Sequence, residues 1–397
     1  MSKLAIHGGN PIRSGSWPRW PQWDGAEQKQ LLTVLESGEW GGFNDAVRDF
    51  ETLFAERHQA AYCYTATNGT QTLEAALRVV GVGHGDEVIV PPYTFIATAN
   101  AARLAGATPV FVDIDPATYN LDIALVEAAI TSKTKAIIPV HFAGLPADMD
   151  ALMPLAKKHG IYVIEDAAHA HGSTWHGKPV GTIGHIGSFS LQASKNLTAG
   201  EGGILLTNHK ALSGKLWSYI NQGRKPEGAW YEHGILGNNL RMTGWQAAIL
   251  LAQMTRFETQ LQQRQENARR LHAILEEVDG LSPQQWDERC DLHAHHLFIM
   301  RYDEAAWQGV PRQTFVKALQ AEGVPLSIGF TVPLYDQPPL AAPYSRHLPC
   351  PATERACRSE GTWMHHSVLL AEPEAMDDIA RAIFKVREQI DTLHNVA

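Results

Sequence analysis

Short apolar runs that alternate with amphipathic stretches constrain the fold of this chain more than any other feature. The apolar runs cover residues 87–92, 108–114, 135–142, 162–168, 188–192 and 203–208. Helical patterns lie between most of them, for example at residues 69–80, 97–106 and 148–160. Strands that alternate with helices form a mainly parallel sheet with both faces covered. The sequence therefore predicts an α/β fold whose chemistry lies at the carboxyl ends of the strands.

The pattern changes along the chain and predicts three regions. Residues 1–30, rich in Trp, Pro and Gly, predict an extended arm whose aromatic rings dock on another surface. Residues 31–250 contain the alternating pattern and predict a large cofactor domain. A helical pattern at residues 245–277 contains no Pro or Gly and is long enough to span two domains. Residues 251–397 are expected to hold this linking helix and a smaller C-terminal α/β domain.

Charge and hydropathy exclude several classes of protein. The 33 basic residues against 42 acidic ones give a formal charge of −9, which argues against a nucleic-acid partner. No apolar run approaches the roughly 18 residues of a membrane helix, and the first residues do not resemble a secretory signal. We therefore expect a cytoplasmic protein with no membrane partner.

The chain has 19 histidines, and their clusters raise the question of a metal site. If residues 293–296 begin a strand, His293 and His295 lie on one face and His296 on the other. No HExxH motif and no nearby pair of carboxylates completes a ligand set. The sequence therefore predicts structural or surface histidines and no metal site.

Lys195 is the first candidate catalytic residue. It follows an apolar run and precedes a Gly-Glu-Gly-Gly turn in the segment SFSLQASKNLTAGEGG. A lysine held by close-packed backbone at the end of a strand is a candidate nucleophile. A solvated loop lysine is the alternative, so partners elsewhere in the chain must decide.

Two other segments supply groups that complement such a lysine. Asp166 ends the apolar run of VIEDAAHAHG, where a buried carboxylate needs a cation, although it could instead cap a helix. The TNGT turn leads directly into a helix, and Gly69 and Thr70 are placed to cradle a phosphate there. An ordinary helix cap is the alternative for this turn. Together, a lysine for an imine, an aspartate for a ring nitrogen and a helix N-terminus for a phosphate are what pyridoxal phosphate requires.

The chain resembles the DegT/DnrJ/EryC1/StrS family over almost its whole length. The matching stretches are TNGT, DEVIVPPYTFIATANA, PVFVDID, TYNLD, KAIIPVHFAG, VIEDAAHAHG, ASKNLTAGEGG and NNLRMTGWQAA. The resemblance implies a fold-type I aminotransferase that uses pyridoxal phosphate to aminate keto-sugars or keto-cyclitols. The stretches WPRWPQWD, PADMDALM and WMHHSVLL resemble the cyclitol branch, which includes glutamine:scyllo-inosose aminotransferases and 3-amino-5-hydroxybenzoate synthases.

The resemblance also implies a role for each matching position. Lys195 matches the Schiff-base lysine, and Asp166 matches the partner of the pyridine nitrogen. His169 matches the residue that contacts the phenolic oxygen, and Phe95 matches the aromatic residue that stacks on the ring. The phosphate contacts are matched by Gly69, Thr70 and Ser190 on the same chain and by Asn239 from the neighbouring subunit. The active site is therefore expected at a homodimer interface. Gln192 departs from the histidine of many sugar aminotransferases, a change that favours the cyclitol branch.

The acceptor site is less defined by the sequence. Arg224, Trp230 and Tyr231 of the loop at residues 223–234 are candidates to close over a polyhydroxylated ring, or they are interface residues. His365 and His366 are candidates to reach the cofactor pocket from the small domain.

The resemblance implies transamination of a cyclic ketone, such as scyllo-inosose or 2-deoxy-scyllo-inosose, with L-glutamine as the donor, in aminocyclitol or other secondary-metabolite biosynthesis. A 3-amino-5-hydroxybenzoate synthase and a nucleotide keto-sugar aminotransferase remain alternatives. A nicotinamide oxidoreductase is disfavoured because the run GVGHGD precedes a strand and is no GxGxxG turn. Lys195 argues against a non-enzymatic relative and against related 3-dehydrases, in which a histidine replaces the lysine.

Overall fold

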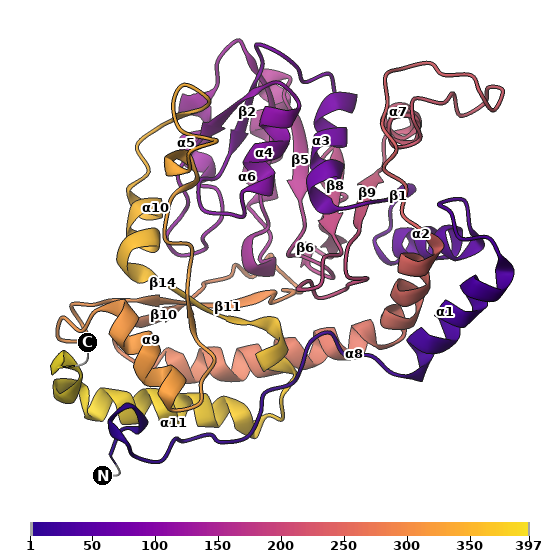
Figure 1. The fold of residues 1–397 in the computed structure, drawn as a ribbon. Coiled ribbons are helices and arrows are strands. Elements are labelled where there is room, and N and C mark those ends of the chain that lie inside the picture. Colours follow the sequence, from indigo (N-terminus) through magenta and orange to yellow (C-terminus); the bar gives the residue numbers. More distant parts are fainter. Residues whose placement is uncertain (1–2, 396–397) are drawn as a thin grey trace.

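An eight-stranded, mainly parallel sheet forms the centre of the molecule (Figure 1). The computed structural model describes residues 3–395. In spatial order the strands are β1 (Tyr62–Ala66), β9 (Gly203–Thr207), β8 (Ile186–Ser190), β5 (Tyr162–Asp166), β4 (Thr134–Ile137), β2 (Glu87–Val90), β3 (Thr108–Phe111) and β13 (Arg346–His347). The pairs from β8 to β13 are parallel, whereas β9 runs antiparallel to both β8 and β1. The predicted fold class is confirmed.

Helices cover both faces of this sheet, as the alternating pattern predicts. They are α2 (Asp45–Arg57), α3 (Gly69–Val79), α4 (Ala97–Leu104), α5 (Ile123–Ala129), α6 (Met149–His159) and α7 (Lys210–Ile220). Helices α3, α4 and α7 share one apolar core with the sheet, while α5 and α6 belong to another. Asn68, Asp122 and Asp148 cap α3, α5 and α6 by accepting backbone N–H bonds. A two-stranded hairpin of β6 (Thr174–Trp175) and β7 (Lys178–Pro179) completes this part.

The C-terminal part is built on a second, antiparallel sheet. Its strands, in spatial order, are β10 (Leu281–Pro283), β11 (Leu297–Tyr302), β14 (Gly361–His365) and β12 (Ser327–Ile328). Its helices are α9 (Arg312–Ala321), α10 (Pro351–Arg355) and α11 (Glu374–Glu388). One apolar core joins this sheet to α9, α11 and the end of α8 (Gly244–Leu275).

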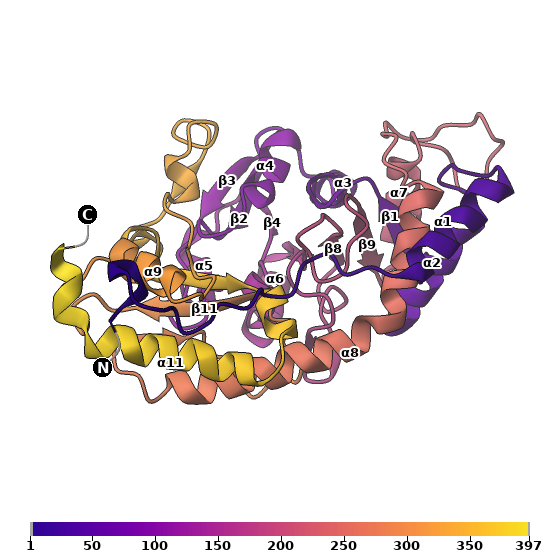
Figure 2. The same ribbon diagram turned by 60° about the horizontal axis from the view of Figure 1, so that its bottom comes forward.

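Helix α8 has 32 residues and connects the two sheets (Figure 2). Its first half packs against α1 (Gly25–Ser37) and α2, and its second half packs against α11 and the 3-10 segment His366–Leu370. The predicted long helix is therefore confirmed. The boundaries expected at residues 30 and 250 fall within α1 and α8, and the division into domains stays a prediction. No described helix is long and apolar enough to cross a membrane.

The N-terminal arm runs along α11 and α8 before α1 begins (Figures 1 and 2). Trp17 Nε1 donates a hydrogen bond of 2.8 Å to the Gly323 carbonyl, and the Arg13 guanidinium lies 4.4 Å from the Trp17 ring centroid. Asp24 ends the arm by capping α1 in a capping box with Glu27. Docking of the arm through its aromatic side chains is confirmed at Trp17.

Candidate active site

A cavity of about 800 Å³ lies at the carboxyl ends of β5 and β8, beside the N-terminus of α3. Seven of the predicted site residues line it: Gly69, Thr70, Phe95, Asp166, His169, Ser190 and Lys195. They come from separate segments that each follow or end a strand, which is where an α/β sheet exposes its loops. The fold thus brings the lysine, the aspartate and the helix N-terminus to one site.

Lys195 lies in a tight turn after β8. Its backbone N–H donates to the Gln192 carbonyl at 2.8 Å, and Gln192 Oε1 accepts from both the N–H and the hydroxyl of Ser194, at 2.9 and 2.7 Å. Desolvation by the surrounding protein lowers the pKa of the Lys195 amine to about 8, and the charge of Asp166 opposes this shift. A larger fraction of neutral amine, the nucleophilic form, is therefore present near neutral pH than for a free lysine.

Asp166 ends β5 and is buried. Its carboxylate accepts hydrogen bonds from Thr98 Oγ1 at 2.8 Å and from the Ala168 N–H at 3.2 Å. Burial raises its pKa, while these two hydrogen bonds and the charge of Lys195 lower it. Within residues 3–395 this carboxylate forms no ion pair, so a cationic partner in the cavity would satisfy it.

The turn before α3 packs directly on β8. Asn68 Oδ1 accepts from the Gln71 N–H at 2.9 Å and caps the helix. A Cβ atom on Gly69 would lie 2.8 Å from Ser190 Cβ, so only glycine allows this close approach. The backbone of Gly69 and Thr70 and the hydroxyl of Ser190 therefore converge where the positive end of the α3 dipole meets the cavity. The helix cap that the sequence offered as an alternative is present at this turn, and the phosphate cradle stays a prediction.

The predicted strand placement of the histidine cluster is wrong. Strand β11 begins only at Leu297, and His295 has a φ of 47°, which interrupts an extended backbone before it. The three histidines are buried, and the rings of His293 and His295 stack with centroids 3.7 Å apart. His296 instead lines the cavity and stacks on His169 with centroids 4.2 Å apart.

His296 has a defined tautomer. Asn196 Nδ2 donates to the Ala294 carbonyl at 2.7 Å, which directs Asn196 Oδ1 to accept from His296 Nδ1 at 3.0 Å. Burial, reinforced by the charges of His169 and Lys195, holds the pKa of His296 well below its ordinary value. A neutral imidazole therefore joins the cavity wall, a contribution that the sequence did not reveal.

The DegT/DnrJ/EryC1/StrS aminotransferase family model matches residues 21–384. The chain belongs to this family. It is 41% identical to the 3-amino-5-hydroxybenzoate synthase of Amycolatopsis mediterranei over 380 residues, covering 92% of this chain and 96% of that one. It is 38% identical to the L-glutamine:scyllo-inosose aminotransferase of Streptomyces griseus over 425 residues, covering 98% of each. The crystal structure of 3-amino-5-hydroxybenzoic acid synthase superposes with a TM-score of 0.88 at 37% identity, covering 95% of this chain and all of that one.

Membership of the DegT/DnrJ/EryC1/StrS family makes the chain an enzyme of a pyridoxal-phosphate-dependent aminotransferase family. The resemblance stated from the motifs is thereby confirmed, as is the enzyme class. The relatives at about 40% identity include aminotransferases named for cyclitol ketones and a synthase named for an aromatic product. This chain therefore lies in the cyclitol branch of the DegT/DnrJ/EryC1/StrS family.

The residues predicted to bind the acceptor or to reach a neighbouring subunit do not line the cavity that contains Lys195. Arg224 stacks its guanidinium 4.3 Å from the Trp230 ring centroid, and Tyr231 is 84% exposed. Arg224, Trp230 and Tyr231 belong to the loop after α7 that extends away from the sheet (Figure 1). Asn239 forms an isolated antiparallel β-bridge with Asn221 at the base of this loop. His365 Nε2 lies 3.2 Å from the Ser194 carbonyl, behind the lysine turn.

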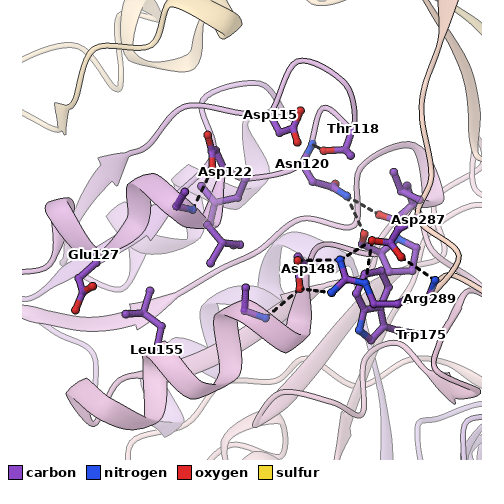
Figure 3. Close-up of a pocket in the computed structure, with 16 residues that line it drawn as sticks. Asp115, Thr118, Asn120, Asp122, Glu127, Asp148, Leu155, Trp175, Asp287 and Arg289 are labelled. Carbon is purple, nitrogen blue, oxygen red and sulfur yellow. Dashed lines mark hydrogen bonds and ion pairs between the residues drawn. The ribbon is translucent and has the colours of Figure 1, made fainter.

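A second cavity, of about 570 Å³, shares no lining residue with the first (Figure 3). Its charged lining residues are five acids and one arginine, and this arginine, Arg289, pairs with Asp148 at 3.0 Å and also with Asp287. None of the described residues that line it is a lysine or a histidine. No group of three or more potential metal ligands occurs between residues 3 and 395. This cavity therefore lacks the groups of a transamination site.

Proposed function

We propose that this protein transfers the amino group of L-glutamine to the ring ketone of a keto-cyclitol, such as scyllo-inosose or 2-deoxy-scyllo-inosose, with pyridoxal phosphate bound at Lys195. The observation that carries the proposal is the meeting of Lys195, Asp166 and the α3 N-terminus in one cavity. The L-glutamine:scyllo-inosose aminotransferase among the relatives supports this substrate class, whereas the 3-amino-5-hydroxybenzoate synthase supports the alternative acceptor that is tested below. The pathway class is aminocyclitol or other secondary-metabolite biosynthesis.

The residues of the cavity fit pyridoxal phosphate. The buried Asp166 carboxylate forms no ion pair among the described residues, and a protonated ring nitrogen would supply one. Gly69, Thr70 and Ser190 would hold the phosphate at the helix N-terminus. Phe95 would stack on the ring, and His169 would contact its phenolic oxygen. The pKa of His169 is held well below its ordinary value by burial and by the charge of Lys195, which favours the neutral form at this position.

The chain's own groups manage the proton transfers. When bound, pyridoxal phosphate supplies an electron sink for the pair left on the donor's α-carbon. Lys195 would hold the cofactor covalently, and its free amine would act as the general base that takes the proton from the donor's α-carbon and as the general acid that delivers a proton to the cofactor carbon that bears the amino group. Asp166 would hold the proton on the ring nitrogen through an ionic hydrogen bond. Phe330 and Trp363, whose ring centroids lie 5.1 Å apart, help to close the cavity on the side of the second sheet and exclude water.

The acceptor can be identified by half-reactions. The enzyme is first converted to its pyridoxamine form with glutamine, with glutamate and alanine as alternative donors. Ketones are then added one at a time, and the recovery of the aldehyde spectrum is followed. We expect scyllo-inosose or 2-deoxy-scyllo-inosose to restore it fastest. If an aminodehydroshikimate-type ring alone reacts, the enzyme is a 3-amino-5-hydroxybenzoate synthase; if nucleotide keto-sugars alone react, the cyclitol assignment is wrong.

The same proposal includes a homodimer with shared active sites. The loop after α7 presents Tyr231 and Leu236 to solvent, with 84% and 94% of their surfaces exposed. An apolar groove that includes Trp23, Leu35 and Trp245 lies between α1 and the start of α8. Exposed apolar and aromatic side chains gathered next to an apolar groove are typical of protein interfaces. Asn239, at the base of the loop, reaches the phosphate of the neighbouring subunit in this arrangement.

A mixed dimer tests this assignment. Lys195→Ala and Asn239→Ala homodimers are each expected to be impaired. In a hybrid, one site has both defects and the other has neither. Equal mixing makes half of the dimers hybrid, so activity should return to about a quarter of that of the wild type. If Asn239 serves its own chain, co-expression restores nothing, since no site is then complete. Sedimentation of each variant confirms that the dimers form.

A further inference from the structure

Both peptide carbonyls that flank the Lys195 side chain are held from outside the lysine turn. The Ser194 carbonyl lies 3.0 Å from His366 Nε2 and 3.2 Å from His365 Nε2. The Lys195 carbonyl accepts a hydrogen bond of 3.1 Å from Trp20 Nε1. Trp20 belongs to the N-terminal arm, and the two histidines lie where β14 ends. Segments far from the lysine in sequence thus hold its backbone.

Arg264 of α8 fixes the tautomer of His366. The Arg264 Nε–H, which can only donate, lies 3.3 Å from His366 Nδ1, so this nitrogen accepts. His366 Nε2 therefore carries the proton and donates to the Ser194 carbonyl. Burial and the charge of Arg264 hold the pKa of His366 well below its ordinary value, in agreement with a neutral ring.

Trp20, His366 and Arg264 also pack on one another. The Trp20 ring meets the His366 ring edge-on, with centroids 4.6 Å apart, and the Arg264 guanidinium lies 5.2 Å from the Trp20 centroid. Arg264 and His366 are fully buried. Arg264 Nη1 and Nη2 have no hydrogen-bond partner among the described residues. Burying a guanidinium with two unpaired nitrogens carries a desolvation cost, so packing alone does not explain an arginine at this position.

We infer that Trp20, His366 and Arg264 are positioning residues that hold the backbone of Lys195, and so keep its amine directed into the cavity. The inference rests on the proposed role of Lys195. A peptide that is held on both sides leaves the amine fewer orientations, and proton transfer is sensitive to displacements of about 1 Å. The arm and the second sheet thereby act on the reaction without touching the substrate.

The arm offers a matched pair of variants. Trp20→Phe removes one indole N–H from the Lys195 carbonyl and keeps an aromatic ring. Trp17→Phe makes the same change in the same arm but removes the bond to Gly323. We expect similar losses of Tm in both variants. In Trp20→Phe alone, we expect a roughly tenfold slower formation of the Lys195 imine by cofactor-free protein mixed with pyridoxal phosphate, and a similar fall in kcat with little change in the KM for glutamine.

A second pair keeps the inference testable if one variant folds poorly. His366→Gln places an amide N–H near the Ser194 carbonyl, whereas His366→Leu removes the closer of the two histidines from this carbonyl and leaves His365 at 3.2 Å. We expect the glutamine variant to form the imine several-fold faster than the leucine variant. Equal imine formation rates in the two Phe variants, or in the two His366 variants, would overturn the inference. An active Lys195→Ala protein would instead overturn the proposed function, so the two failures are distinguishable.

Discussion

Lys195→Ala is expected to lower kcat by about 10⁴-fold or more and to remove the visible absorbance of the covalently bound cofactor. The side chain supplies both the covalent attachment and the group that moves the α-proton, so alanine loses both functions at once. No other lysine lines the cavity, among the residues that the structure describes, to replace it. Stopped-flow kinetics with glutamine and an absorbance spectrum of the purified protein check this result.

One further substitution separates the imine chemistry of Lys195 from its positive charge, and a second, at another lysine, serves as the control. Lys195→Arg keeps a cation of similar length, but a guanidinium stays protonated and forms no imine, so this variant should be equally inactive. Lys178→Ala removes an exposed lysine of β7 and should leave the kinetics unchanged. In the wild type, imine formation should accelerate as pH rises through about 8, because burial lowers the pKa of Lys195 to that value.

A different outcome would remove the basis of the assignment. If the Lys195→Ala protein still formed the covalently bound cofactor, another amine would carry the reaction. That result would contradict the role of this cavity. If imine formation in the wild type accelerated only near pH 10, the ordinary range for lysine, burial would not lower the pKa of Lys195 as expected.

The large sheet could be predicted because its central strands are buried on both faces and therefore appear as continuous apolar runs. The edge strands could not. Strand β1 mixes polar and apolar residues, and β13 is only two residues long and pairs with β3 from far away in the sequence. Most of the short antiparallel strands of the second sheet were also missed, because each is defined by its partner and carries little pattern of its own.

The core of the site was predictable for a related reason. Lys195, Asp166 and Gly69 each follow a strand or end one, and parallel strands bring such positions to a common edge. Trp20, Thr98 and His296 act through tertiary packing, with partners far away in the chain. The sequence predicted that the aromatic rings of the arm dock, but it did not predict that Trp20 contacts the Lys195 backbone, and no local pattern marks Thr98 or His296. His296 in particular was assigned to a structural cluster, because the backbone turn at His295 that directs it into the cavity has no sequence signature.

Asp166→Asn is expected to lower kcat by about 10³-fold while leaving the shape of the site intact. Asparagine has the size of aspartate and its carbonyl oxygen accepts from Thr98, but it carries no charge to hold a proton on the ring nitrogen. The electron sink that the bound cofactor supplies is then weakened. Thr98→Val is the matched control, since it removes the 2.8 Å hydrogen bond and keeps the carboxylate. A loss of about tenfold is expected there.

The stability of the cofactor-free protein separates this electrostatic role from a folding role. Burial raises the pKa of Asp166 above its unfolded value, so the folded state binds the proton more tightly. This carboxylate therefore costs stability as pH rises through its folded pKa. Asp166→Asn removes the buried charge, so the Tm of the cofactor-free variant at pH 7 should equal or exceed that of the wild type.

Adding pyridoxal phosphate should reverse this order. A ligand that binds only the folded protein raises Tm, and a tighter ligand raises it more. The wild type would gain an ionic hydrogen bond to the ring nitrogen that the variant lacks. The Tm increment on cofactor addition should therefore be smaller for Asp166→Asn than for the wild type or for a variant of an exposed carboxylate such as Asp45→Asn. Equal increments, together with a lower Tm of the cofactor-free variant, would make Asp166 a structural residue and leave the ring nitrogen without its proposed partner.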